Sequence, residues 1–177
     1  RPESNLSYIL FDILVWDGGQ FNEQPVFSVY NMGGIRADFA KGDINVGDVS
    51  EVAPFENKIC FLTLTGEKVL ELFQQIAHRG GEGVSHAVRM VITRDGKLKG
   101  VTLNGEPVDP AKSYRIATLD YLAEGNDQLV AFKSGTDVVA PKSKENNVRY
   151  IIMDYLREMK AQGKVVESRV EGRCVVE

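Results

Sequence analysis

The strongest constraint on the fold comes from residues 58–77, where a strand pattern passes directly into a helix pattern. Lys58 to Thr65 alternates as a strand, and Thr65 is a good helix N-cap. The glycines and Arg79 of His78-Arg79-Gly80-Gly81 are ordinary features of a helix C-terminus, and we interpret His78 as a last-turn residue. Between these ends, apolar residues recur at helical spacing, at Val69, Leu70, Phe73, Ile76 and Ala77. This succession indicates a fold that mixes helices with sheet.

The rest of the chain repeats this mixture. Helices are predicted from the apolar face of Leu6 to Leu14, which Asp17-Gly18-Gly19 stops, and from the face that runs from Val148 to Met159 and ends before Gly163. Apolar runs predict strands at Pro25–Tyr30, Val88–Thr93, Val101–Leu103, Tyr114–Leu119 and within Val165–Val176. No internal repeat or domain boundary is visible, so residues 1–177 are predicted to form a single mixed α/β (α+β) domain, with a mixed sheet flanked by helices.

The composition excludes several classes of function. Hydrophobic residues make up 43% of the 177 residues and charged residues 26%, as in an ordinary globular domain. The net charge of −4 and the lack of a Lys/Arg cluster argue against a nucleic-acid polymer as the main partner. No apolar stretch is long enough to span a membrane, and no signal peptide is visible. We expect the chain, which opens at Arg1-Pro2-Glu3-Ser4, to be a cut-out piece or a mature fragment, so its compartment stays open.

Cysteine and histidine are scarce. Cys60 alternates in step with Leu62 and Leu64, which predicts a small core residue, and Cys174 follows in a short apolar stretch. Nothing in the sequence asks for a disulfide between the two, nor excludes one. His78 and His86 do not have a metal-ligand spacing, so no metal site is predicted, and two-metal hydrolase chemistry has no evident home in this chain.

Three loops carry chemistry. Asn31-Met32-Gly33-Gly34-Ile35-Arg36 follows an apolar strand, and its two glycines let the backbone approach a ligand. Pro54-Phe55-Glu56-Asn57 holds a phenylalanine outside any regular apolar pattern, and Asp120 to Asp127 follows another strand. Taken alone, the first loop also fits a tight turn with Arg36 in a surface ion pair, and Phe55 also fits a loop aromatic that packs on the core.

Together the three loops suit a nucleoside. They offer two aromatic rings, two amides, a guanidinium and a carboxylate. Aromatic rings stack on a base with about 1–3 kcal/mol per base and little dependence on which base it is. A carboxylate accepts hydrogen bonds from ribose hydroxyls, and an arginine serves an anionic or polar edge through its fork of donors.

At these loops the chain resembles the C-terminal domain of the 5'-nucleotidase/apyrase family, which includes UDP-sugar hydrolases and cyclic-nucleotide phosphodiesterases. The resemblance covers nearly the whole chain, and it is the order and spacing of the pieces that make it specific. These pieces are Glu3-Ser4-Asn5-Leu6-Ser7, the Asn31–Arg36 loop, Gly42-Asp43-Ile44, Pro54-Phe55-Glu56-Asn57, Leu64-Thr65-Gly66, the stretch from Gly105 through Pro107 to Tyr114-Arg115, and Gly125-Asn126-Asp127.

The resemblance implies a role for each loop. Phe55 and Tyr121 would sandwich the base, and Asn31 and Asn57 would hydrogen-bond the base or the sugar. Arg36 would hold the ribose or phosphate side, and Asp127 would bind the ribose hydroxyls, while Gly33 and Gly34 would let the backbone approach. Tyr121 stands where the family frequently has Phe. Asn126-Asp127-Gln128 replaces Gly-Asp-Gly, which puts the backbone geometry of that loop in question.

The resemblance also implies a division of labour. Catalysis in such nucleotide-catabolic hydrolases would lie in a separate N-terminal metallophosphatase domain with two divalent metal ions, in cis or in trans, and absent from this chain. This chain alone is then expected to bind a nucleotide or nucleoside and to be inactive, with a periplasmic, cell-envelope or extracellular location. The alternatives are a stand-alone nucleoside-binding protein, and a structural module whose pocket has decayed.

Overall fold

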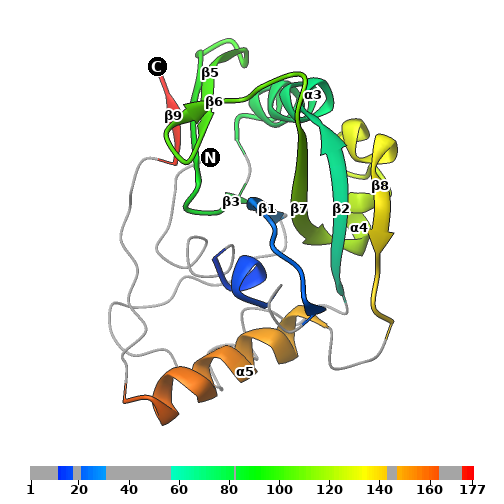
Figure 1. Cartoon of the computed structure of the whole chain (residues 1–177). Coiled ribbons are helices and arrows are strands. Elements are labelled where there is room, and N and C mark those ends of the chain that lie inside the picture. The colour runs from blue at the N-terminus through cyan, green and yellow to red at the C-terminus, as the bar shows by residue number, and fades with distance from the viewer. Residues whose placement is uncertain (1–11, 18–20, 31–56, 82, 143–146, 164–172) are drawn as a thin grey trace.

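A computed structural model of the chain describes residues 12–17, 21–30, 57–81, 83–142, 147–163 and 173–177. The described strands form two mixed sheets, one in the order β3-β1-β7-β2-β8 and one in the order β6-β5-β4-β9. Figure 1 shows the second sheet at the top left, beside the C-terminus, and the helix α5 on the opposite side at the bottom. The mixed α/β prediction is therefore confirmed, with two sheets in place of one.

The five-stranded sheet is built around β7 (Ser113–Leu119). β1 (Phe27–Tyr30) runs parallel to it, and β2 (Ile59–Thr65) runs antiparallel on its other side. β3 (Gly83–Val84) and β8 (Thr136–Val139) form the two edges. The apolar runs predicted at Pro25–Tyr30, Lys58–Thr65 and Tyr114–Leu119 thus all lie in this sheet.

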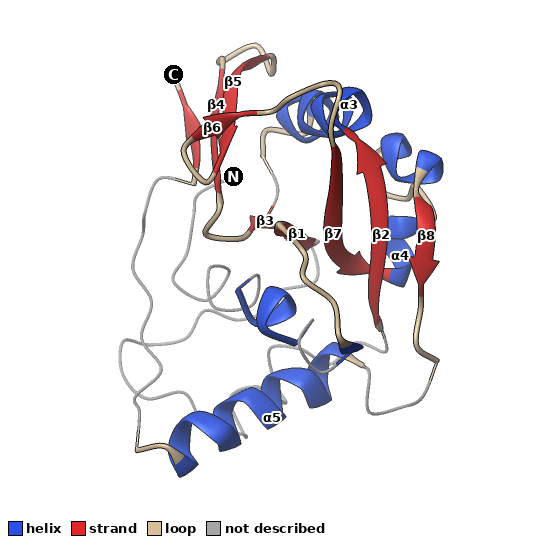
Figure 2. Ribbon diagram, in the orientation of Figure 1, coloured by secondary structure: helices blue, strands red, loops and turns tan. Residues whose placement is uncertain are grey.

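The central strands of this sheet pack against apolar residues on both faces. On one face, Leu62, Leu64 and Ile116 pack with the residues of α3 (Gly66–His78). On the other face, Phe61 and Leu119 pack with residues 13–14 and with α5 (Val148–Ala161). Figure 2 shows α3 and α5 on opposite sides of the red strands. The alternation of side chains along each strand therefore divides the core into two clusters.

The helix α3 begins and ends where its local sequence dictates. The hydroxyl of Thr65 accepts a hydrogen bond from the amide of Lys68 (3.3 Å), which caps the N-terminus. After His78, Gly80 takes a φ of +80° and its amide donates to the carbonyl of Ala77 (2.9 Å). The buried face includes Val69, Phe73 and Ile76, and the ring of Phe73 packs against that of Phe27 with centroids 5.3 Å apart. The predictions of this helix and of its last residue, His78, are confirmed.

The four-stranded sheet is mainly a pair of hairpins. β4 (Val88–Ile92) pairs with β5 (Leu98–Leu103) across a turn at Asp95-Gly96, where Gly96 has a φ of +81°. Asn104 and Gly105, both with positive φ, lead into the short β6 (Glu106–Pro107). β9 (Cys174–Val176) adds a parallel strand to β4. β9 confirms a strand within Val165–Val176, of which residues 164–172 lie outside the described part.

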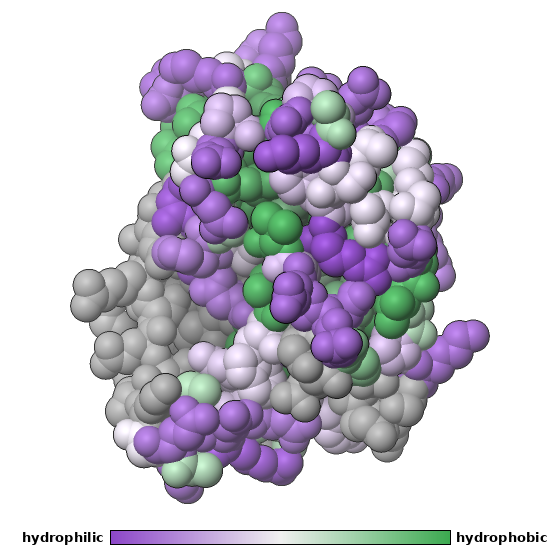
Figure 3. Space-filling view, in the orientation of Figure 1, coloured by the Kyte–Doolittle hydropathy of each residue, from purple (hydrophilic) through white to green (hydrophobic). Residues whose placement is uncertain are grey.

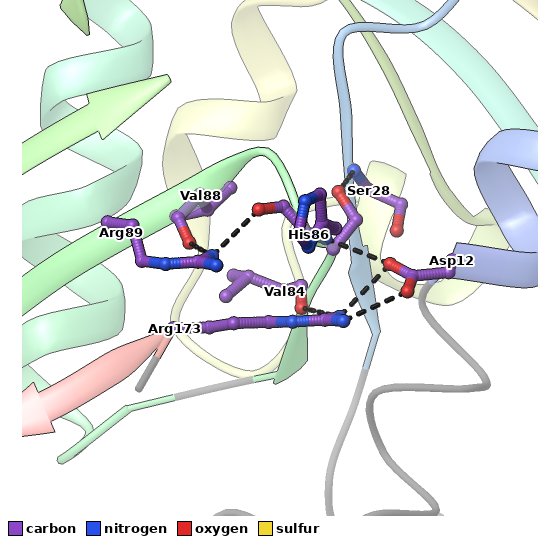
Figure 4. Close-up of polar contacts among 8 residues, drawn as sticks. Asp12, Ser28, Val84, His86, Val88, Arg89 and Arg173 are labelled. Carbon is purple, nitrogen blue, oxygen red and sulfur yellow. Dashed lines mark hydrogen bonds and ion pairs between the residues drawn. The ribbon is translucent and has the colours of Figure 1, made fainter. Parts of the chain in front are cut away.

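The C-terminal strand is tied to the first helix by an ion pair whose arginine is buried. Arg173, 2% exposed, places its two terminal nitrogens 3.0 and 2.9 Å from the carboxylate oxygens of Asp12, and it also donates to the carbonyl of Val84 (Figure 4). The same carboxylate accepts the amide of His86 at 2.8 Å. Residues 12–17 are helical, and the Trp16 ring meets the ring of Tyr155 on α5 edge-on. The described part of the predicted first helix therefore packs on α5.

The two cysteines are not joined by a disulfide in the structure, where Cys60 is buried in the sheet and Cys174 is partly exposed. Burial raises the pKa of the Cys60 thiol to about 11, which keeps it protonated at neutral pH. The prediction of Cys60 as a core residue is confirmed. On the surface, Figure 3 shows apolar residues in green at the place of β8, where Val138 and Val139 are exposed, and a mostly hydrophilic face on α5.

Candidate functional site

Two strands of the five-stranded sheet end, and a third begins, at the same end of the sheet. β1 ends at Tyr30, and because it runs parallel to β7 with Phe27 opposite Ile116, its end lies level with that of β7. β2 runs the other way and begins here, with Ile59 opposite Leu119. Strand ends of this kind are frequent positions for ligand sites, since a rigid sheet places the loops that follow. Each of the three loops singled out in the sequence adjoins one of these ends.

Asp120 joins two of these loops. Its amide donates to the carbonyl of Lys58 (2.9 Å), and its carboxylate accepts the amides of Lys58 (3.2 Å) and Tyr121 (2.8 Å). Asn57, half-buried, precedes Lys58, and its carbonyl accepts the amide of Val148 at the start of α5. The structure therefore brings the Asn57 segment beside the Tyr121 segment.

Tyr121 and Asp127 are in direct contact. The Tyr121 hydroxyl donates to the Asp127 carboxylate at an O–O distance of 2.9 Å. The Tyr121 side chain is one of the few large hydrophobic groups left exposed among the described residues, with 38% of the residue accessible. The bond to the Asp127 carboxylate and the charge of that carboxylate raise the pKa of Tyr121. An accessible aromatic ring therefore lies next to a carboxylate that has unused acceptor capacity.

The segment 120–128 is partly helical rather than a simple loop. α4 (Asp120–Ala123) forms a single turn, and Gly125 then takes a φ of +89°. The amide side chain of Asn126 donates to the carbonyl of Tyr121 (2.7 Å), which closes the turn. A four-residue helix is too short to show a helical period, which is why the sequence indicates only a loop here.

Asp127 and Gln128 both adopt left-handed backbone, with φ of +58° and +66°. This conformation costs roughly 1–2 kcal/mol for a residue with a side chain. Gln128 stands where the resembled family has Gly, so the loop keeps a glycine-like geometry without the glycine. The surrounding structure must offset the cost.

The contacts that hold this backbone come from α3. The Arg79 guanidinium donates to the carbonyl of Asp127 at 2.7 Å, and its other terminal nitrogen lies 3.9 Å from the Asp127 carboxylate. One turn earlier, the Gln75 side-chain oxygen accepts the amide of Ala131 (2.9 Å). Residues four apart on a helix share a face, so Gln75 and Arg79 together hold residues 127–131.

The family assignment rests on a match that spans most of the chain. Residues 1–134 match the model of the 5'-nucleotidase C-terminal domain. The chain belongs to this family.

Known proteins agree with this assignment. The chain is 38% identical to the protein UshA of Escherichia coli K12 over 104 residues, which are 57% of this chain and 19% of that protein. It is 27% identical to the cell wall protein Lmo0130 of Listeria monocytogenes, over 98% of this chain and 24% of that protein. The crystal structure of a 5'-nucleotidase precursor from Thermus thermophilus superimposes with a TM-score of 0.83 at 29% identity, over 99% of this chain and 36% of that one. The chain thus spans less than a quarter of these two sequence relatives.

In this 5'-nucleotidase C-terminal domain, three of the eight predicted site residues are described. Asn57, Tyr121 and Asp127 lie at the same sheet edge, and Tyr121 touches Asp127. The other five predicted site residues lie outside the described part of the chain: Asn31, Gly33, Gly34, Arg36 and Phe55. The same holds for the whole Asn31–Arg36 loop. Arg79, which the sequence indicated only as a helix-end residue, also contacts Asp127. No local signal could have indicated it, because its partner lies 48 residues away.

The described residues do not fit a metal pair. Within them, no group of three or more His, Cys, Asp or Glu side chains is close enough together to hold a metal ion. None of the helices in the described ranges is long and apolar enough to cross a membrane. The described groups at the ends of these strands are an exposed aromatic ring, a carboxylate and backbone and side-chain amides.

Proposed function

We propose that the chain is the nucleotide- or nucleoside-recognition domain of a 5'-nucleotidase-type phosphoester hydrolase. The base lies between the rings of Phe55 and Tyr121, and Asp127 accepts hydrogen bonds from the ribose hydroxyls. Asn31 and Asn57 hydrogen-bond the base or the sugar, Arg36 serves the ribose or phosphate side, and Gly33 and Gly34 let the backbone approach.

The observation that supports this proposal most directly is the contact between Tyr121 and Asp127. A nucleoside presents a flat apolar face a short distance from two hydroxyl donors. The exposed Tyr121 ring complements the flat face, and the Asp127 carboxylate complements the hydroxyls. The two groups are joined by one hydrogen bond of 2.9 Å. The positions of Asn57 and of the end of β1 at the same edge add two further loops in the order that the family pattern requires.

The chemistry of hydrolysis is assigned to another domain. We propose that a metallophosphatase domain, N-terminal in cis or supplied in trans, holds a pair of divalent metal ions and cleaves the ester, while this chain has no catalytic residues. The match covers only 19% of UshA and 24% of Lmo0130, so most of each relative lies outside the matched part and is long enough for such a domain. The name of the Listeria cell wall protein supports an envelope or extracellular location.

Binding is tested by calorimetric titration of the 177-residue chain with adenosine and with AMP. We expect saturable binding of at least one of the two. Phe55→Ala and Tyr121→Leu should each weaken it at least about fivefold, because stacking contributes on the order of 1–3 kcal/mol per base. Tyr155→Leu is a matched control, since its ring packs against Trp16 on the far side of the sheet, and it should leave the dissociation constant unchanged.

Two results would contradict the proposal. Absence of binding by either ligand at millimolar concentration excludes the base clamp, and binding that ignores both aromatic substitutions puts the pocket elsewhere. A separate assay of phosphate release from AMP, with Mg²⁺, Mn²⁺ or Zn²⁺ added, should find no turnover. Genuine turnover by the pure chain would contradict the assignment of catalysis to another domain.

A further inference from the structure

We propose that Arg79 and the hydroxyl of Tyr121 are positioning groups that aim the Asp127 carboxylate at the ribose hydroxyls. This inference rests on the proposed function and adds two groups to it, one on the backbone side of Asp127 and one on its side-chain side. Arg79 touches neither base nor sugar in this scheme, and acts only through Asp127.

Arg79 fixes the backbone of the loop. Its guanidinium comes from the C-terminal end of α3, is only 16% exposed, and donates to the Asp127 carbonyl at 2.7 Å. A hydrogen bond from a charged donor contributes more than one between neutral groups. It acts on the residue that begins the left-handed pair Asp127–Gln128, where the backbone is intrinsically unfavourable. Gln75 secures the far side of the same segment through the amide of Ala131.

The Tyr121 hydroxyl fixes the side chain of Asp127. It donates to Oδ1, whereas Oδ2 is the oxygen that faces Arg79, 3.9 Å away. The carboxylate is therefore held between a donor on α4 and the cation of Arg79, the residue that follows α3. Each carboxylate oxygen has two lone pairs, so both oxygens retain acceptor capacity for incoming hydroxyls. The hydroxyl of Tyr121 thus does something that a phenylalanine at this position cannot do.

The expected consequence is a selective loss. A group that only positions the carboxylate matters for ligands with ribose hydroxyls and is nearly irrelevant for ligands without them. The measured quantity is the ratio of the dissociation constants of 2',3'-dideoxyadenosine and adenosine, taken by calorimetry on the full 177-residue chain. A general loss of stability or of stacking changes both constants together and leaves the ratio unchanged.

Four variants test this ratio. Asp127→Asn should bring it close to one. Tyr121→Phe keeps the ring and should weaken adenosine binding about three- to tenfold, with little change for the dideoxy ligand, since one hydrogen bond to a charged group is removed. Arg79→Gln should also lower the ratio. Arg79→Lys, which keeps a charged donor, should lower it less than Arg79→Gln does. Arg157→Gln, an exposed ion-pair residue on α5, is the matched control and should leave the ratio unchanged.

The outcomes separate this inference from the function on which it rests. If the unmodified chain binds neither ligand, both fail. If it prefers adenosine and loses the preference in Asp127→Asn, but keeps it in Tyr121→Phe and Arg79→Gln, the recognition function stands and the positioning roles are wrong. If Arg79→Gln does not fold, Tyr121→Phe and Arg79→Lys decide: full retention of the ratio in either variant overturns the role of the residue that it replaces.

Discussion

Arg173 and Asp12, 161 residues apart in the chain, form a two-pronged ion pair with nitrogen–oxygen distances of 3.0 and 2.9 Å. The two partners are unequally accessible, because the Arg173 side chain is 2% exposed and the Asp12 side chain 44%. The pair joins the first described helix to β9, and the amide of His86 joins it from the turn before β4 (Figure 4). This charge contact therefore links the two ends of the described chain directly.

The unequal burial predicts unequal effects of removing either partner. Asp12→Ala removes the carboxylate that pairs with the buried guanidinium and should lower the free energy of unfolding by about 3 kcal/mol. Arg173→Met removes the buried charge itself, and water can solvate the half-exposed Asp12, so its cost should be smaller. Urea denaturation of both variants measures this difference. An Arg173→Met variant that is the less stable of the two would contradict the account.

Such a contact shows where prediction from sequence stops. The β2–α3 unit was predictable because its signals are local: alternation up to Thr65, an N-cap there, and a helical period that ends before Gly80. The division of the strands into two sheets was not, since β1 pairs with β7 and β4 with β9 across long separations. Nothing near Asp12 or Arg173 in the sequence indicates that they meet.

The candidate site divides in the same way. Tyr121 and Asp127 are six residues apart in one loop, so the sequence alone predicted that they lie near each other. Arg79 belongs to a different element, and its second role depends on how α3 packs beside residues 127–131. The left-handed backbone of Gln128 also depends on that packing, because a glutamine has no intrinsic preference for it. The roles assigned to Asn31, Arg36 and Phe55 stay predictions.

Gly66 is predicted to tolerate no side chain. A Cβ at this first residue of α3 would lie 1.9 Å from the carbonyl oxygen of Asp109, a backbone atom that cannot move aside easily. The Gly66 amide also donates to the carbonyl of Lys112 at 2.7 Å, which fixes the approach. Gly66→Ala should therefore lower the free energy of unfolding by roughly 2–3 kcal/mol, despite the better helix propensity of alanine.

Gly100 offers the matched control for that change. It lies on β5, an ideal Cβ there meets no atom within 4 Å, and its φ is not in the left-handed range. Gly100→Ala should be neutral or slightly stabilising, because it lowers the conformational entropy of the unfolded chain. Thermal unfolding of the two variants side by side gives the comparison. Equal losses of stability would mean that the contact with Asp109 does not limit Gly66.

Arg115 is predicted to resist replacement by lysine. Its guanidinium donates to both carboxylate oxygens of Glu23, at 2.7 to 3.1 Å, and also to the Thr63 hydroxyl and the Asp137 carbonyl. These bonds tie the segment before β1 to three strands in a largely buried position. A lysine cannot reproduce the planar fork, so Arg115→Lys should cost about 1–2 kcal/mol of unfolding free energy. Lys99→Arg, at an exposed ion pair with Glu177, should change stability little in the same denaturation assay.

Asp17 is expected to make stability depend on pH. The residue is 6% exposed, its Oδ2 accepts no hydrogen bond from the part of the chain that the structure describes, and burial together with the nearby Asp154 carboxylate raises its pKa from 3.8 to about 6. Because the folded state holds this proton more tightly than the unfolded state, the contribution of Asp17 to stability decreases as the pH rises from about 4 to 6. Above that range the ionised side chain costs the folded state up to about 3 kcal/mol.

Asp17→Asn removes the ionisation and should therefore stabilise the protein at pH 7. The gain over the unmodified chain should decrease as the pH falls from about 6 to about 4 and nearly vanish below that range, where Asp17 is protonated in both states. Urea denaturation of both proteins at pH 4, 5, 6 and 7 measures this difference, and the other titrating groups cancel in it. Asp154→Asn removes only the neighbouring charge, so it should shift the profile in the same direction by a smaller amount. A variant Asp17→Asn that is less stable than the unmodified chain at pH 7 would show that the carboxylate is held by charge or hydrogen bonding rather than strained by burial.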